Sequence, residues 1–196
     1  RGLVGSEMCI RDRYKELAQL ETSKIFTRYL LETIFKMCYN PQFRYLHKSK
    51  SKNEIKNTIK SFVDTNKVDI VIKVDGLAGG KGVFVQGDHF NTLDEGLNII
   101  YNKLQDKNIL IEEKLIGDEF SLFTLSDGDH FVHLPPVQDF KRAYNNNKGP
   151  NTGGMGSIMH QFDFLTDNDI SECETLNANV LMSLKHKYNK PYIGVL

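Results

Sequence analysis

The chain has 196 residues, 40% of them hydrophobic and 26% charged, a composition typical of a folded domain rather than of a disordered or fibrous chain. Basic and acidic residues each number 25, so the formal net charge is zero and the basic surplus expected of a nucleic-acid-binding protein is absent. No apolar run could span a bilayer, and Cys9, Cys38 and Cys173 are too few and too scattered for a disulfide framework, so we expect a cytoplasmic protein that binds neither nucleic acid nor membranes.

The chain begins with a stretch that has no clear structural pattern. Residues 1–13 lack apolar periodicity, and we set them aside as a non-native or disordered segment. Apolar residues then recur at helical spacing over 14–37, and a second amphipathic helix is predicted over 53–64. Between these two helices, Phe43–Leu46 is predicted to form a short strand.

Strands and helices alternate in the next part of the chain. The β-branched, apolar run over 69–74 predicts a buried strand, which a glycine-rich loop over 75–82 joins to a return strand over 83–86. A helix is predicted over 92–104, and a second buried strand over 108–113.

Hairpins dominate the second half. Strands are predicted over 119–126 and 130–134, and two adjacent prolines then begin an irregular stretch over 137–156, dense in Lys, Arg, Asn and Gly. A last helix is predicted over 168–188, and a strand begins within 191–196. This order of elements predicts an α+β protein with mixed sheets.

The strongest local signal is the segment VIKVDGLAGGKGV at 71–83. A buried strand delivers Lys73, and a loop with four glycines then presents Lys81. Glycines let backbone N–H groups turn toward an anion, and two ammonium groups beside them favour a polyphosphate. The spacing matches neither a P-loop nor a dinucleotide fingerprint. An ordinary hairpin turn with a surface lysine would give similar letters, but a lysine within an apolar strand is costly unless it has a partner.

Two further segments carry candidate polar sites. In ILIEEKLIGDEFS at 109–121, a strand ends in paired carboxylates, a position from which a purine and a ribose can be bound, although a solvated strand end would look alike. In the segment after Leu134, Asp139 could hold an ammonium group, and Lys141 with Arg142 could hold a carboxylate or phosphate. Its glycine-rich end is either an anion cradle or a flexible loop.

Three segments carry a resemblance to a known family: VIKVDGLAGGKGV, ILIEEKLIGDEFSLF and PPVQDFKRAYNNNKGPNTGGMG. In this order and at these separations they resemble the phosphoribosylamine–glycine ligases (glycinamide ribonucleotide synthetases) of the ATP-grasp superfamily. The first two segments would fit many ATP-grasp enzymes, and the third selects this ligase. LAQLETSKIF at 17–26 also resembles that family's first ATP-grasp helix, so the resemblance covers 14–196.

The resemblance implies an α+β, ATP-grasp fold with mixed and antiparallel sheets, truncated at both ends. We expect a first helix and connecting segment over 14–66, a lid subdomain over 67–116, and a second, incomplete subdomain over 117–196. ATP would lie between the two subdomains.

The resemblance also implies which residues bind ATP. Lys24 and Lys73 would hold its phosphates, and Glu119 would take the ribose hydroxyls. The adenine would be read by Glu112, Glu113 and Leu115, and the loop closing over the phosphates would include Gly79, Gly80, Lys81 and Gly82.

In the reaction that the resemblance implies, the γ-phosphoryl group of ATP passes to the carboxylate of glycine. The amine of 5-phosphoribosylamine then attacks this acyl phosphate, which releases phosphate and forms glycinamide ribonucleotide, a step of purine biosynthesis. Asp139, Lys141 and Arg142 are the candidates for holding glycine and its developing charge. The same pocket would be lined by Asn151, Thr152, Gly153 and Gly154.

The departures from the family pattern concern the ends of the chain. The family's N-terminal domain is missing, and the ligands for Mg²⁺ or Mn²⁺ are expected downstream of Leu196, with none inside this chain. We therefore expect the fragment to be inactive by itself, and a monomeric parent is compatible with the sequence.

Two other functions remain open. The parent could be another ATP-grasp carboxylate–amine ligase with a different acceptor, or a non-catalytic module that binds ATP. ADP release that depends on the substrate supplied would separate the two ligases, and ATP binding without turnover would identify the module.

Overall fold

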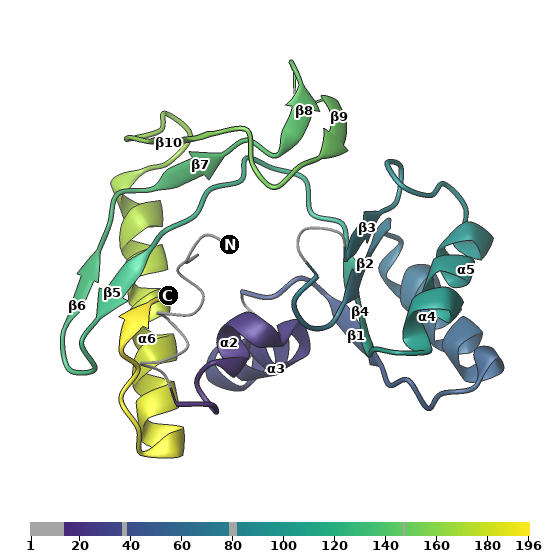
Figure 1. Ribbon diagram of the computed structural model, residues 1–196, viewed down its shortest axis with the longest axis horizontal. Helices are drawn as coiled ribbons and strands as arrows, with labels where there is room; N and C mark the ends of the chain where they lie inside the picture. The colour runs from purple at the N-terminus through teal and green to yellow at the C-terminus, as the bar shows by residue number, and fades with distance from the viewer. Residues whose placement is uncertain (1–13, 37–38, 79–81, 147) are drawn as a thin grey trace, which may run out of the picture. The chain divides into compact units, whose positions relative to one another are not determined.

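A computed structural model describes residues 14–36, 39–78, 82–146 and 148–196 (Figure 1). The predicted terminal segment 1–13 lies outside these residues, as do Gly79, Gly80 and Lys81. The chain forms two compact units. The first unit is Leu20–Ile116, and the second joins the described residues up to Gln19 with Gly117–Leu196.

A four-stranded antiparallel sheet lies at the centre of the first unit. Its strand order is β1 (Phe43–Leu46), β4 (Ile109–Glu113), β2 (Ile70–Val74) and β3 (Val83–Val85). The inner strands β2 and β4 are rich in isoleucine and valine, which suit a pleated surface covered on both sides. All four strands predicted in this part of the chain are confirmed to within one residue at each end.

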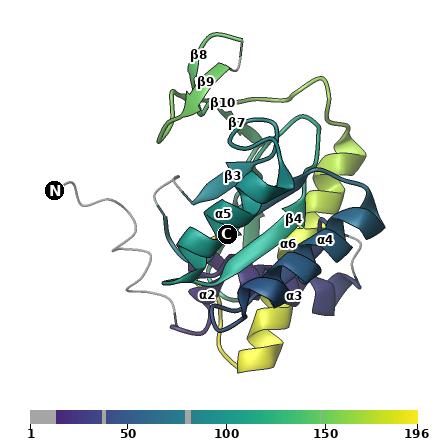
Figure 2. The same ribbon diagram turned by 90° about the vertical axis from the view of Figure 1, so that its right-hand side faces the viewer.

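Two amphipathic helices, α4 (Lys52–Asn66) and α5 (Leu93–Leu104), cover one face of this sheet (Figures 1 and 2). Each begins with a capping box, in which the hydroxyl of Ser51 or Thr92 accepts an N–H of the first turn. The glutamate at the third helical position bonds back to the N-cap backbone. The two helices predicted in this part of the chain are therefore confirmed, and their starts have a local cause.

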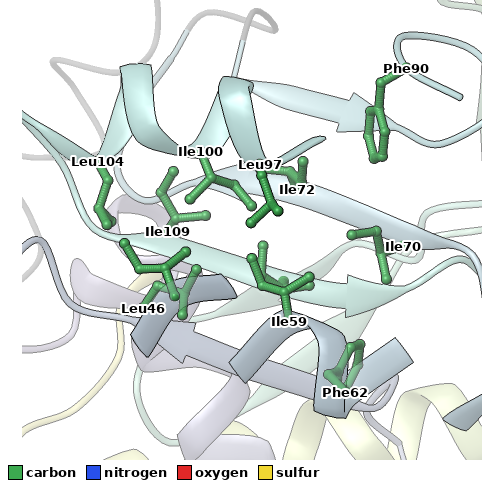
Figure 3. Close-up of a cluster of buried hydrophobic side chains, with 12 residues drawn as sticks. Leu46, Ile59, Phe62, Ile70, Ile72, Phe90, Leu97, Ile100, Leu104 and Ile109 are labelled. Carbon is green, nitrogen blue, oxygen red and sulfur yellow. The ribbon is translucent and has the colours of Figure 1, made fainter. Parts of the chain in front are cut away.

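The main hydrophobic core lies between the sheet and these two helices (Figure 3). Alternate strand residues point to opposite faces, so Ile109 and Ile111 enter the core while Leu110 and Glu112 face away from it. Every side chain of the cluster is at most 4% exposed. The cluster contains Leu46, Ile55, Ile59, Phe62, Ile70, Ile72, Phe90, Leu97, Ile100, Leu104, Ile109 and Ile111.

Helix α3 (Lys24–Phe35) lies on the opposite side of the sheet from α4 and α5 (Figure 1). The ring of Tyr29 meets the ring of Phe43 edge to face, with 5.4 Å between their centroids. The helix ends at Lys36, whose left-handed backbone lets its N–H bond to the carbonyl of Glu32. This second helical layer brings polar residues of α3 over the face of the sheet that carries Glu112.

The single helix predicted over 14–37 is wrong, because the chain breaks at Ser23. A short helix α2 (Gln19–Thr22) precedes the break, and Ser23 has extended backbone angles of φ −138° and ψ 110°. Its hydroxyl accepts the N–H of Phe26 at 3.1 Å and so caps α3. Apolar spacing continues across the break, and periodicity alone could not reveal it.

The second unit contains a three-stranded antiparallel sheet beside one long helix (Figure 1). The strand order is β11 (Gly194–Val195), β5 (Thr124–Ser126) and β6 (Phe131–His133), and the helix is α6 (Asp167–Tyr188). The predicted hairpin, last helix and terminal strand are confirmed. In the described part of the chain, no helix is both long enough and apolar enough to cross a membrane.

The stretch over 137–156, predicted to be irregular, contains strands. Strand β7 (Val137–Asp139) pairs with β10 (Ser157–Met159), and β8 (Arg142–Tyr144) pairs with β9 (Lys148–Asn151). We call residues 137–159 the arm. Each of its strands has only three or four residues, too few to show the alternating apolar pattern on which a strand prediction depends.

The strand predicted over 119–126 is also shorter than expected. Only Thr124–Ser126 is regular, and Ser121 forms an isolated bridge with Val137. The carbonyl of Phe123 accepts the N–H of Leu134, so the backbone partner changes along the segment and no continuous ladder forms.

We expect Gly128→Ala to destabilise the second unit by about 2 kcal/mol. Gly128 has a φ of +101°, and an added Cβ would lie 2.5 Å from the Cβ of Pro191. Gly117→Ala is the matched control, because nothing lies within 4 Å of its Cβ position. Urea unfolding measures both variants, and equal free energies of unfolding would contradict the prediction.

Candidate functional site

The first feature of the candidate site is the ammonium group of Lys24 at the start of α3. Its Nζ donates to the carbonyl of Val74 at 3.1 Å and to that of Gly76 at 2.8 Å. Burial lowers the pKa of Lys24; the charge of Asp75 opposes this shift, and the ammonium groups of Lys73 and Lys107 add to it. Lys24 therefore lies where strand β2 opens into the glycine-rich loop, and its phosphate-binding role stays a prediction.

Asp75 joins the start of α3 to the end of β2, a role that the sequence did not suggest. Both of its carboxylate oxygens accept the hydroxyl of Ser23 at 3.2 Å, and Oδ1 also accepts the backbone N–H of Ile25 at 3.2 Å. A carboxylate at a helix N-terminus is favoured by the helix dipole. Asp75 thereby fixes the backbone that carries Lys24.

Lys73, Glu112 and Arg28 form a cluster of three charges on the face of the sheet opposite the main core. One oxygen of Glu112 contacts the Nε of Arg28 at 2.5 Å, and the other contacts the Nζ of Lys73 at 2.5 Å. The side chain of Glu112 is 3% exposed, whereas those of Lys73 and Arg28 are 24% and 22% exposed. The partner that a lysine in this strand needs is therefore Glu112.

Arg28 was missed by the sequence reasoning, although one signal could have found it. It follows Lys24 by four residues, so the two cations lie on the same side of α3. The segment 17–26, whose resemblance to the family suggested Lys24, ends two residues before Arg28.

The charge on Glu112 should make stability depend on pH. Burial by itself raises the pKa of Glu112, but the hydrogen bond from Arg28 and the charges of Lys73 and Arg28 outweigh it, so the pKa is lowered. A carboxyl group with a lowered folded-state pKa stabilises the fold above its unfolded pKa, and this contribution is lost as pH falls. We expect the free energy of unfolding to fall between roughly pH 5 and pH 3.

Urea unfolding across this pH range tests the expectation. Glu112→Gln should be less stable at neutral pH and should lose less stability on acidification, because glutamine has no proton to take up. Parallel pH profiles for the wild type and the variant would show that other carboxyl groups cause the acid loss.

The remaining residues predicted to bind adenine and ribose differ in their exposure and in their hydrogen bonds. The carboxylate of Glu113 accepts the N–H of Gln42 at 2.8 Å, which ties β4 to the residue before β1. Leu115 is 69% exposed and Glu119 is exposed. The structure thus leaves Leu115 and Glu119 accessible, and the roles assigned to these residues stay predictions.

Position 82, at the end of the glycine-rich loop, leaves no room for a side chain. A Cβ there would lie 2.6 Å from the Cβ of Ala78, and the Gly82 carbonyl accepts the N–H of Val74 at 2.7 Å. At Gly76, φ is +92°, and the Nζ of Lys107 lies 3.6 Å from the Cβ position. A cavity of about 280 Å³ lies between this loop and the end of α5, slightly below the usual volume of a small-molecule site.

In the second unit, Lys141 lies between two carboxylates. Its Nζ is 3.3 Å from an oxygen of Glu119 and 3.4 Å from an oxygen of Asp139. Burial by itself lowers the pKa of Lys141, but Glu119 and Asp139 outweigh it and raise the pKa. Lys141 is therefore a cation at neutral pH and suits a binding role better than that of a general base.

The arm holds the other predicted substrate residues through its backbone. Arg142 donates from Nη1 to the carbonyl of Gly149 at 2.9 Å, within the β8–β9 hairpin. Thr152 donates its N–H and its hydroxyl to the carbonyl of Lys141, at 2.7 and 2.9 Å, and accepts the N–H of Gly154. Gly153 and Gly154 have open space where a Cβ would be, and the side chain of Asn151 lies outside the described part.

The predicted site residues therefore form two groups, one in each unit, and we describe each group by itself. Lys24, Lys73 and Glu112 belong to the first, and Lys141 with Asp139 to the second.

A comparison with protein families finds one match, the phosphoribosylglycinamide synthetase, ATP-grasp (A) domain, over residues 22–196. The chain belongs to this family.

Relatives with curated names agree with this assignment to the synthetase A-domain family. The phosphoribosylamine–glycine ligase of Methanoregula boonei is 36% identical over 185 residues, which cover 93% of this chain and 40% of the relative. The enzyme of the same name from Methanocella arvoryzae is 40% identical over 131 residues, covering 65% and 30%. The chain thus spans less than half the length of these relatives.

Solved structures show that this member of the A-domain family has an α+β, ATP-grasp fold. The phosphoribosylamine–glycine ligase of Thermotoga maritima matches with a TM-score of 0.77 and 30% identity, covering 98% of this chain and 48% of that one. The D-alanyl-alanine synthetase A of Vibrio cholerae matches with a TM-score of 0.63 at 12% identity, over 87% and 50%, and shows the fold alone. The predicted family and fold are confirmed.

Members of the A-domain family are expected to use a divalent metal ion with ATP. Among them, no three His, Cys, Asp or Glu side chains gather into a possible metal site. The carboxylate of Glu112 is already shared by two cations. The described part of the chain therefore does not fit a metal ion.

Proposed function

We propose that this chain is the ATP-grasp part of an enzyme that joins glycine to 5-phosphoribosylamine at the expense of ATP. The family match over 22–196 is the observation that carries the proposal. The relatives named above are phosphoribosylamine–glycine ligases, and the arm contains all but the first two residues of the segment most specific to that resemblance.

In the proposed reaction, a carboxylate oxygen of glycine attacks the γ-phosphorus of ATP, and the bond from that phosphorus to the leaving ADP oxygen breaks. The amine of 5-phosphoribosylamine then attacks the carbonyl carbon of the glycyl phosphate, loses a proton, and displaces phosphate. Phosphoryl transfer of this kind depends mainly on positioning and charge neutralisation. The chain supplies cations for both tasks.

The first unit is proposed to bind the phosphates of ATP. Lys24 is anchored at the end of β2, and Lys73 is held by Glu112 with a quarter of its side chain exposed. The net charge of Lys73, Glu112 and Arg28 is positive, which favours a polyphosphate. The proposed adenine contacts are Glu112, Glu113 and Leu115, and Glu119 is the proposed ribose ligand.

The second unit is proposed to bind glycine. Lys141 stays protonated between Glu119 and Asp139, so its ammonium can attract the carboxylate of glycine and oppose the charge that develops on it. Asp139 can accept the ammonium group of glycine. Arg142 and residues 151–154 of the arm are proposed to line the same pocket.

Several finer points belong to the same proposal. We expect Mg²⁺ or Mn²⁺ to assist the reaction through ligands downstream of Leu196. A cytoplasmic location is proposed because ATP and free thiols are kept there. A monomeric parent stays a prediction.

The test is an assay of ADP formation by the protein expressed from the complete gene that carries this chain. ADP should form only when glycine and 5-phosphoribosylamine are both present, and glycinamide ribonucleotide should accumulate in equal amount. ADP formation with bicarbonate or alanine in place of glycine would indicate another ATP-grasp ligase. ATP binding without ADP formation under any of these conditions would indicate a non-catalytic module, and either result overturns the proposal.

A further inference from the structure

We propose that Arg28 is a positioning residue, which acts through Glu112 to keep Lys73 available to the phosphates of the nucleotide. The inference rests on the proposed function, because it assigns a role within the proposed ATP site. It is carried by the charge cluster of the first unit, in which one buried carboxylate serves two cations.

Each oxygen of the Glu112 carboxylate contacts a different cation. Glu112 presents Oε1 to the Nε of Arg28 and Oε2 to the Nζ of Lys73, each at 2.5 Å. The two residues approach from different elements, Arg28 from α3 and Lys73 from β2. Because Arg28 occupies one oxygen, Lys73 contacts only the other and keeps donors for a further anion.

Arg28 is itself held in place. Its carbonyl accepts the amide N–H of Asn40 at 2.8 Å, and its Nη1 lies 3.4 Å from the amide oxygen of Asn40. The start of α3 is fixed by the bonds from Ser23 and Ile25 to Asp75. The guanidinium group therefore meets Glu112 from a backbone anchored at two points, as a positioning role requires.

The charges explain why this position matters. With Arg28 present, two cations and one carboxylate leave the cluster with a net charge of plus one. Without Arg28, Lys73 and Glu112 would form a neutral pair. Little water reaches Glu112, so the attraction within that pair is weakly screened, and a polyphosphate would have to compete with both carboxylate oxygens for Lys73.

The experiment compares Arg28→Met, Glu112→Gln and the double variant in the protein expressed from the complete gene. The dissociation constants of ATP and of adenosine are measured for each protein, with thermal unfolding as a check on folding. Arg28→Met should weaken ATP binding roughly tenfold and leave adenosine binding unchanged, because adenosine carries no phosphate. The double variant should recover most of the wild-type ratio of ATP affinity to adenosine affinity, because removing the carboxylate charge restores the net charge of plus one. The ratio is used because the loss of an adenine contact at Glu112 would weaken both ligands alike.

A purely structural role for Arg28 predicts different results. ATP and adenosine binding would then weaken together, and the double variant, which lacks both partners, would show no recovery. Either result, or unchanged ATP binding in Arg28→Met, overturns the inference. If Arg28→Met does not fold, the double variant and Arg28→Lys decide it. A wild-type-like ratio of ATP affinity to adenosine affinity in both supports the role of charge, and a loss of ATP affinity relative to adenosine affinity in Arg28→Lys overturns it.

Failure of the inference can be told from failure of the proposed function. A wild-type protein that forms ADP with glycine, together with an Arg28→Met variant that binds ATP normally, would overturn the inference alone. A wild-type protein that binds ATP but does not use glycine would overturn the proposed function, and the recovery in the double variant would still be measurable by binding.

Discussion

Replacing Lys73 with methionine is expected to lower kcat/KM for ATP by about 10²–10³. Lys73 is the cation of β2 that the phosphates of ATP would meet, and methionine keeps much of its length without its charge. The variant also leaves Glu112 with Arg28 as its one remaining partner in the cluster, so the net charge falls from plus one to zero. Steady-state kinetics with ATP as the varied substrate measure the effect.

The matched control for this variant is Lys60→Met. Lys60 lies on the exposed side of α4 in the same unit, so its loss changes the overall charge equally without touching the cluster. We expect the control to keep kcat/KM within about twofold of the wild type, because a distant surface charge is screened by salt. Equal losses in the two variants would mean that Lys73 has no specific role in ATP binding.

Replacing Lys141 with methionine is expected to lower kcat by about 10² and to raise the KM for glycine. The variant removes the cation between Glu119 and Asp139, and the two carboxylates would then repel the carboxylate of glycine. Initial rates with glycine as the varied substrate separate the change in KM from the change in kcat.

Lys185→Met is the control for the second unit. Lys185 is 48% exposed and pairs with Asp129, and Lys141 is 50% exposed. The control therefore removes an equally exposed, ion-paired lysine from another part of the same unit. The control should keep normal kinetics. If Lys141→Arg were no more active than Lys141→Met, the contribution of positive charge at this position would be refuted.

The elements of the first unit could be predicted from the sequence because their signals are local. Strand β1 is found at the predicted Phe43–Leu46, and β2 and β4 follow the predicted runs of isoleucine and valine. Helices α4 and α5 carry both an apolar stripe and a capping box, so the local and tertiary preferences agree.

The errors fall where the deciding contacts are distant along the chain. The break at Ser23 is supported by Asp75, which lies 52 residues away. The strands of the arm are too short to show a pattern of their own, and β7 pairs with β10, which lies beyond the β8–β9 hairpin along the chain. Periodicity within a short window contains neither fact.

The candidate site divides in the same way. By itself the sequence determined the family resemblance, the buried strand with Lys73, the glycine-rich loop and the carboxylates at the end of β4, because each depends on neighbouring residues. Only the tertiary structure decided that Glu112 joins Lys73 to Arg28, that Asp75 anchors the start of α3, and that Lys141 lies between two carboxylates. The physical reason is that the partner of a charge depends on which elements pack together in space, and the order of residues along the chain does not specify that packing directly.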